Sequence, residues 1–220
     1  PDSDGNYGYG LEIVDGSMAE IDGCDIAHNT SAAVFIDTVG TIVRMRDTVV
    51  RHTLLDPLGN VGVGIVVAND AELVASACSI EGNAAAGLDI EGAGTRVFLV
   101  DSVVRDTRCN GAGLLGAGVA VYAGEVELRD CLLEANRAAG LSVDAMASAR
   151  VASTTIRGPL ADATPITGHG VLVRGGGVPR ARSTILEHNT TAGVPVYGWA
   201  AHSSQLCSSA SLHGVESPGT

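Results

Sequence analysis

The sequence predicts an all-β fold, a right-handed parallel β-helix of about eight coils, and three observations favour it. They are a composition rich in glycine and small apolar residues, a repeat of alternating length, and apolar residues at every second position. They predict a single β-helix domain over residues 1–220, with a lead-in at 1–9, coils over 10–198 and a C-terminal cap or tail at 199–220.

Composition limits the kind of core that the chain can form. Hydrophobic residues make up 45% of the chain but aromatic residues only 3%, so the core must consist of Ala, Val, Ile and Leu. The 29 glycines are too many for a helical bundle, and the 7 prolines are too few for a disordered or collagen-like chain. A turn-rich β fold remains.

A repeat of alternating length runs through the chain. Successive units begin 23, 31, 23, 31, 22, 30 and 23 residues apart, so short and long coils alternate. The extra residues fall at the end of each long coil, at 54–63, 107–117 and 159–169, which predicts three equivalent loops on one edge of the stack. The units start at Gly10, Ala33, Gly64, Gly87, Gly118, Gly140, Gly170 and Gly193.

Within each unit, apolar residues alternate in short bursts such as Leu11 and Ile13 or Leu88 and Ile90, which is typical of strands. Three short strands in a coil of about 22 residues are the geometry of a parallel β-helix. No segment has a helical apolar stripe, which excludes alternating strands and helices. A β-propeller is the alternative, because pairs of units repeat every 52 to 54 residues, but one blade should not contain two copies of a motif.

Stacked coils place equivalent residues in columns. One column is expected to hold small inward side chains, and alternate cysteines in it would lie about 9.6 Å apart, too far for disulfides. A second column is expected at a sharp turn with left-handed backbone, where asparagine amides bind the backbone, and His28, His52 and His188 are expected to be dispersed along the axis. The first column is Cys24, Thr48, Cys78, Ser102, Cys131, Thr154 and Thr184, and the second is Asn29, His52, Asn83, Asp106, Asn136, Gly158 and Asn189.

The charge balance narrows the possible partners. The chain has 25 acidic and 13 basic residues, a net charge of −12, which makes nucleic acid and anionic membranes poor partners. No apolar run is long enough for a membrane-inserted helix, and no signal peptide is recognisable. Because an open solenoid end must be covered, we expect either further chain upstream of Pro1 or end-to-end self-association.

The repeat resembles a known family. Units such as Gly118-Val119-Ala120-Val121, followed by Asp130-Cys131-Leu132-Leu133-Glu134-Ala135-Asn136, are similar to the parallel β-helix repeats of the pectate lyase and polygalacturonase superfamily over residues 10–200. The resemblance implies the fold, because such repeats occur in lyases, hydrolases, epimerases, phage tailspikes and non-catalytic surface proteins. The activity motifs do not match: Gly168-His169-Gly170 precedes Asn189-Thr190-Thr191, and Thr191 stands where polygalacturonases have Asp.

Two outward rows of the first strand hold the candidate site. The candidate ligand-binding residues are Asp37, Asp89, Glu91, Tyr122 and Asp144, of which the four carboxylates are also candidate calcium ligands. The alternative interpretation is a solvated charged edge. The first row runs Glu12, Phe35, Val66, Asp89, Ala120, Ser142, Leu172 and Pro195, and the second runs Val14, Asp37, Ala68, Glu91, Tyr122, Asp144, Arg174 and Tyr197.

These features predict a non-catalytic, extracellular or cell-surface module that serves as a scaffold or as a binding surface for glycan or protein. No cofactor, apart from the calcium option, and no catalytic residue is assigned. The alternative is a polysaccharide lyase or glycoside hydrolase that uses the acidic row, because hydrolysis needs two carboxylates about 5 to 9.5 Å apart. Motifs for phosphate loops, zinc proteases and Cys-x-x-Cys chemistry are absent from the sequence.

Overall fold

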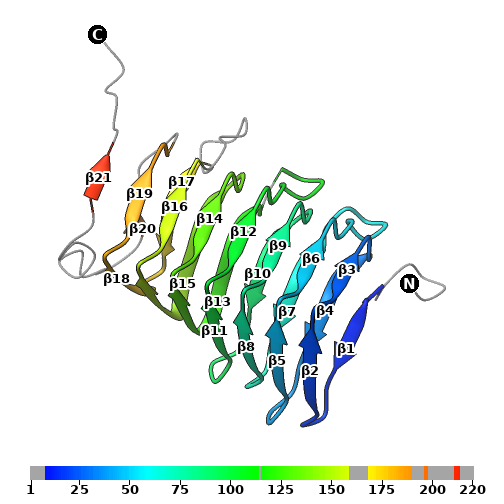
Figure 1. Ribbon diagram of the computed structural model, residues 1–220. Helices are drawn as coiled ribbons and strands as arrows, with labels where there is room; N and C mark the ends of the chain where they lie inside the picture. The colour runs from blue at the N-terminus through cyan, green and yellow to red at the C-terminus, as the bar shows by residue number, and fades with distance from the viewer. Residues whose placement is uncertain (1–7, 114, 159–167, 190–195, 198–210, 214–220) are drawn as a thin grey trace.

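A computed structural model describes residues 8–113, 115–158, 168–189, 196–197 and 211–213, which form a solenoid of parallel strands (Figure 1). Each coil has three sides, and each strand pairs with its equivalent in the next coil. The sides are called the first, second and third sheets, although hydrogen bonding joins the first two into one sheet of 13 strands. The predicted fold class is confirmed. About eight coils are predicted; seven are described on all three sides, two of them with one long strand that serves two sides, and two further short strands extend the stack.

Each sheet takes equivalent strands from successive coils, and β13 (Ala117–Arg129) and β15 (Ala139–Ala152) run through the corner between the first and second sheets. The first sheet also contains β1 (Leu11–Ile13), β4 (Ser31–Ile36), β7 (Gly62–Val67), β10 (Ala86–Ile90), β17 (His169–Arg174) and β20 (Val196–Tyr197). The second sheet adds β2 (Met18–Asp22), β5 (Ile42–Arg46), β8 (Glu72–Ser76), β11 (Arg96–Val100) and β18 (Val178–Arg182). The third sheet is β3 (Asp25–Ala27), β6 (Val49–Arg51), β9 (Ser79–Glu81), β12 (Val103–Arg105), β14 (Leu132–Glu134), β16 (Thr155–Arg157), β19 (Ile185–Glu187) and β21 (Ser211–His213).

Strand β21 lies in the segment 199–220, which is expected to form a C-terminal cap or tail. Residues 211–213 pair in parallel with β19 and so extend the third sheet. The rest of the expected cap, including Trp199 and Cys207, lies outside the described residues. Backbone pairing with an open sheet edge satisfies hydrogen-bonding groups that would otherwise face solvent.

The core is a narrow aliphatic column enclosed by the three sheets. Apolar residues alternate inward along each strand, so that Leu88, Val119 and Leu141 from successive coils pair in register and are completely buried. Burying one such side chain stabilises the fold by about 1.5 to 3 kcal/mol. The predicted aliphatic core is therefore confirmed.

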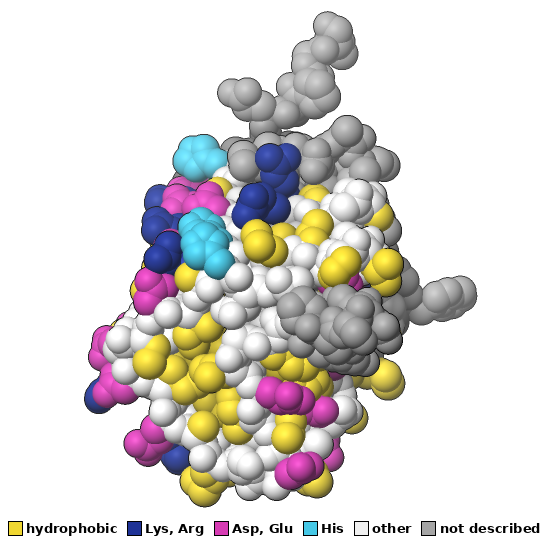
Figure 2. Space-filling model, turned by 90° about the vertical axis from the view of Figure 1, so that its right-hand side faces the viewer, with side chains coloured by type: hydrophobic (Ala, Val, Ile, Leu, Met, Phe, Trp, Pro, Cys, Tyr) yellow, Lys and Arg dark blue, Asp and Glu magenta, His cyan; other side chains and the backbone are white. Residues whose placement is uncertain are grey.

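The stack is open at the first coil. Among the described residues, Leu11 stands in register with buried Val34 of the next coil yet is 38% exposed, and Figure 2, which faces this end, shows hydrophobic side chains gathered on its lower half. In the described part of the chain no helix is long and apolar enough to cross a membrane.

The column of small residues before the third sheet also forms as predicted, and its alternation has a structural reason. The backbone N–H of Cys78 donates to Ser102 Oγ at 3.0 Å, and that of Cys131 donates to Thr154 Oγ1 at 3.3 Å. The hydroxyl of each long coil thus accepts a bond from the cysteine of the short coil before it. Cys78 and Cys131 are buried, whereas Cys24 in the open first coil is exposed.

The asparagine column differs from its predicted position by one residue in the long coils. Pairing in the third sheet aligns Asn29, Asn83 and Asn136 with Thr53 and Thr107, not with His52 and Asp106. The left-handed residue is the one before each of these, and in consecutive coils His28 and His52 therefore stack with ring centroids 5.5 Å apart. Those two histidines are neighbours rather than dispersed. The left-handed positions are His28, His52, Gly82, Asp106, Ala135, Gly158 and His188.

Buried asparagines join each short coil to the long coil before it. Asn136 accepts a hydrogen bond from Thr107 N–H (3.2 Å) and donates to the Val104 carbonyl (3.1 Å). Asn83 makes the equivalent bonds to Thr53 N–H (3.0 Å) and the Val50 carbonyl (3.4 Å). Both side chains are fully buried, so each satisfies backbone groups that water cannot reach.

A charge ladder follows the same double repeat on the outside of the third sheet. Arginine stands on long coils and glutamate on short coils, with Arg105 bound to Glu81 at 2.6 Å and Arg157 bound to Glu134 at 2.8 Å. Exposed pairs of this kind contribute only about 0 to 1 kcal/mol each. Their alternation places opposite charges side by side in this register, whereas like charges would repel. In register, the ladder runs Arg51, Glu81, Arg105, Glu134, Arg157 and Glu187.

Candidate functional site

The outward face of the first sheet forms the floor of a groove. Strand pairing confirms the predicted first row, in which side chains point away from the core between two inward residues of each strand. Bulky Phe35 lies near one end of the row and small Ala120 lies near its middle. The described members of the row are Glu12, Phe35, Val66, Asp89, Ala120, Ser142 and Leu172.

Loops of the long coils flank this floor. The loop before β7 is closed by a bond from Asp56 N–H to the Val61 carbonyl, and the loop before β13 contacts it across the intervening short coil through a bond from Gly111 N–H to the Gly59 carbonyl (2.8 Å). A side chain at Gly111 would lie 3.0 Å from that carbonyl oxygen, so glycine permits the contact. The prediction that loops share one edge is confirmed for these two; the third, at 159–167, lies outside the described residues.

The floor and the loops enclose a groove of about 520 Å³. At one end the rings of Tyr9 and Phe35 stack with centroids 4.6 Å apart, and at the other end Tyr122 and Leu115 separate the groove from a narrower pocket. Other lining residues are Ser31, Ala32, Asp56, Asn60, Val61, Val63, Val66, Ala85, Asp89 and Glu91.

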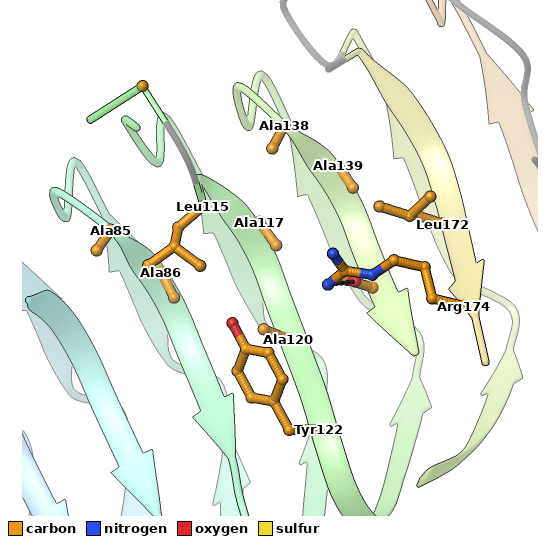
Figure 3. A pocket seen from close by; sticks show the side chains of 12 residues that line it. Ala85, Ala86, Leu115, Ala117, Ala120, Tyr122, Ala138, Ala139, Leu172 and Arg174 are labelled. Atoms are coloured by element: carbon orange, nitrogen blue, oxygen red, sulfur yellow. Dashed lines mark hydrogen bonds between the residues drawn. The ribbon is translucent and has the colours of Figure 1, made fainter. Parts of the chain in front are cut away.

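The narrower pocket continues the groove toward β17. Figure 3 shows Tyr122 and Arg174 reaching from β13 and β17 toward a floor of alanines, with Leu115 on the side of the preceding coil. The pocket has a volume of about 60 Å³. Arg174 donates to Asp144 at 2.8 Å and to Ser142 at 3.4 Å, so its charge is compensated within the protein.

Asp89 is an acid of the groove whose pKa differs strongly from its usual value. Its neighbours in the row are Val66 and Ala120, and its Oδ1 atom has almost no solvent contact and no hydrogen-bond partner. Burial, and secondarily the charge of Glu91, raises the pKa of Asp89 to about 7. Near neutral pH the carboxyl is therefore partly protonated, and its protonated form can donate a hydrogen bond.

Tyr122 lies beside this acid. Burial, and secondarily the charge of Asp89, raises the pKa of Tyr122 to about 12. The phenol thus keeps its proton at physiological pH and presents a hydroxyl donor together with an aromatic face.

The raised pKa of Asp89 gives a prediction about stability. Folding raises this pKa from 3.8 to about 7, so the stabilisation that the protonated acid provides is complete below pH 3.8 and is lost as pH rises to about 7. Because Asp89→Asn does not titrate, its unfolding free energy relative to wild type should rise between pH 4 and pH 8, by up to about 4 kcal/mol. Urea unfolding at both pH values measures this difference. Asp37→Asn is the control, and a constant difference between Asp89→Asn and wild type would contradict the assignment.

The structure brings together only part of the predicted site. Asp89, Glu91 and Tyr122 line the groove. Asp37 lies outside it and accepts a bond from Asn69 Nδ2 at 2.8 Å, and Asp144 is bound to Arg174. Within the described ranges no three His, Cys, Asp or Glu side chains are grouped to hold a metal ion, so the four calcium candidates do not form one site there.

Most lining residues of the groove are not among the predicted site residues, and three of them, Phe35, Tyr9 and Asp56, are aromatic or charged. Phe35 is in the predicted row, and as its only aromatic residue it is a signal that the sequence does contain. Tyr9 precedes the first coil and Asp56 belongs to a loop, so their positions follow from the loop geometry, which the repeat does not encode.

Residues 3–156 match the family described as "Right handed beta helix region". The chain belongs to this family. The match agrees with the parallel solenoid described above and gives its hand. Comparisons with curated proteins and with solved structures found no match.

Proposed function

We propose that this chain is a non-catalytic, extracellular β-helix module that binds a linear glycan along the groove. One observation carries this proposal: the groove combines aromatic faces at Phe35 and Tyr122 with the polar groups of Asp89 and Glu91. Aromatic rings pack on apolar faces of a ligand, and a few placed polar groups orient it.

The shape of the groove supports a chain-like ligand. Together with its narrow continuation it extends from Tyr9, before the first coil, to Arg174 in the seventh. Six coil spacings amount to about 29 Å along the stack. A ligand that follows this line must be extended and parallel to the solenoid axis.

The polar groups offer both kinds of hydrogen bond that sugar hydroxyls need. The Tyr122 hydroxyl and protonated Asp89 can donate, whereas the exposed Glu91 carboxylate accepts. Hydrogen bonds to a charged group are about twice as strong as neutral ones, so Glu91 is expected to orient the ligand.

Removing one aromatic ring tests the proposal. We expect Phe35→Ala to weaken binding of a linear oligosaccharide by about 30-fold, because the loss of a well-packed aromatic contact can cost about 2 kcal/mol. Phe98→Ala is the matched control, since Phe98 faces outward on the second sheet and does not line the groove. The readout is titration calorimetry against neutral, amino and acidic oligosaccharides. Equal losses in the two variants, or no binding by the wild type, would refute a groove site.

A second candidate function is glycoside hydrolysis, which the raised pKa of Asp89 favours. Asp89 lies on β10 and Glu91 directly follows its last residue, so in extended backbone their side chains share a face about 6.6 Å apart along the chain. A protonated acid beside an ionised carboxylate is the arrangement that glycosidases use. New reducing ends released from a bound oligosaccharide by the wild type, but not by Asp89→Asn or Glu91→Gln, would favour this candidate over the binding module.

A further inference from the structure

The charge of the groove indicates what kind of glycan it takes. Asp56, Asp89 and Glu91 line it, and among its described lining residues none is basic. The nearest arginine of the continuing pocket, Arg174, is already bound to Asp144. An anionic glycan would meet uncompensated negative charge along this path.

Asp89 has no positively charged neighbour among the described residues of the groove, and a cationic ligand can supply one. Its buried Oδ1 has no hydrogen-bond partner, and its ionisation is opposed by burial and by Glu91. An ammonium group has three donors and no acceptor, so in the groove it can donate to the exposed Glu91 carboxylate, and its positive charge favours the ionised form of Asp89. A neutral hydroxyl supplies at most one donor and no charge.

The Tyr122 ring beside these acids also favours an ammonium group. Tyr122 is close enough to both Asp89 and Glu91 for their charges to act on its hydroxyl. The negative face of an aromatic ring attracts a cation, and the attraction is stronger where solvent is excluded. Two carboxylates and one ring therefore surround the same part of the groove.

We propose that the groove selects a cationic glycan, one whose sugars carry free amino groups, and holds an ammonium between Asp89, Glu91 and the Tyr122 ring. This inference rests on the proposed glycan-binding function and specifies its ligand class. It applies to the described groove, from the Tyr9–Phe35 pair to Tyr122.

The test compares three hexamers with the same β-1,4 linkage, made of glucose, glucosamine or glucuronic acid. Titration calorimetry of the whole chain at pH 7, where Asp89 is about half ionised, should show the glucosamine hexamer binding at least about tenfold more tightly than the glucose hexamer, the factor expected for one charge-assisted hydrogen bond. The glucuronic acid hexamer should bind most weakly, and added salt should reduce the preference for the amino sugar.

Substitutions of single residues test which side chains cause the preference for the glucosamine hexamer. Glu91→Gln and Asp89→Asn should each reduce the affinity ratio of the glucosamine hexamer to the glucose hexamer by about tenfold, in addition to any loss that the two hexamers share. Asp37→Asn is the matched control, because Asp37 stands on the same outward face but outside the groove, and it should retain the full preference.

The outcomes separate the two proposals. If the glucose and glucosamine hexamers bind wild type equally, or if the glucuronic acid hexamer binds best, the cationic ligand class is wrong although a glycan site remains. If none of the three hexamers binds, the proposed function itself fails. A preference that Asp37→Asn abolishes as fully as Glu91→Gln would also overturn the assignment, because it would reflect net charge only.

Discussion

Asn136→Ala is expected to destabilise the protein by about 3 to 5 kcal/mol. The substitution removes the acceptor for Thr107 N–H and the donor to the Val104 carbonyl, and both backbone groups remain buried. Leaving one buried polar group without a partner costs about 1 to 3 kcal/mol. Urea unfolding followed by circular dichroism measures the loss.

Two further variants separate hydrogen bonding from packing at this position. Asn136→Thr introduces the residue that long coils carry at Thr53 and Thr107, so it fills space without the two bonds and should fall between alanine and wild type. Asn60→Ala, in an exposed loop, should stay within about 0.5 kcal/mol of wild type. An Asn136→Ala protein as stable as Asn60→Ala would show that the asparagine column does not stabilise the fold.

The columns of the solenoid could be predicted because a repeat converts sequence positions into spatial neighbours. The alternation of Cys78 and Cys131 with Ser102 and Thr154 is visible in the sequence, and the structure gives its reason in the bonds between adjacent coils. The predicted asparagine column differs from the observed one by one residue in the long coils, and the difference has a physical reason. Left-handed backbone occurs at the residue before each asparagine, and even Ala135 adopts it there.

The candidate site was only partly predictable, because its properties depend on what lies beside and above each strand. The sequence places Asp89 and Glu91 on the outward face, but the burial of Asp89 arises from Val66 and Ala120 in adjacent coils. Contact between the loops through Gly59 and Gly111 closes one side of the groove. Spacing alone predicts that these loops share an edge, but not that they meet.

Gly118→Ala is the second substitution with a large expected effect, about 3 kcal/mol of destabilisation or more. A Cβ atom at Gly118 would lie 2.5 Å from Asn136 Nδ2 and 2.8 Å from the Gly140 carbonyl oxygen. Overpacking of a rigid interior typically costs about 1 to 3 kcal/mol, and here the nearest atom belongs to a side chain fixed by two hydrogen bonds. The free energy of unfolding in urea is again the measurement.

The second coil shows how this clash can be relieved. There Ala33 occupies the position of Gly118, and Thr53 replaces the asparagine. We therefore expect Gly118→Ala to cost at most about 1 kcal/mol when it is added to Asn136→Thr, because threonine frees the space that the amide occupies. A double-mutant cycle should give a coupling of about 2 kcal/mol or more in favour of the pair. Strictly additive losses would instead locate the clash at the Gly140 carbonyl, and glycine would then be required by the backbone of the next coil.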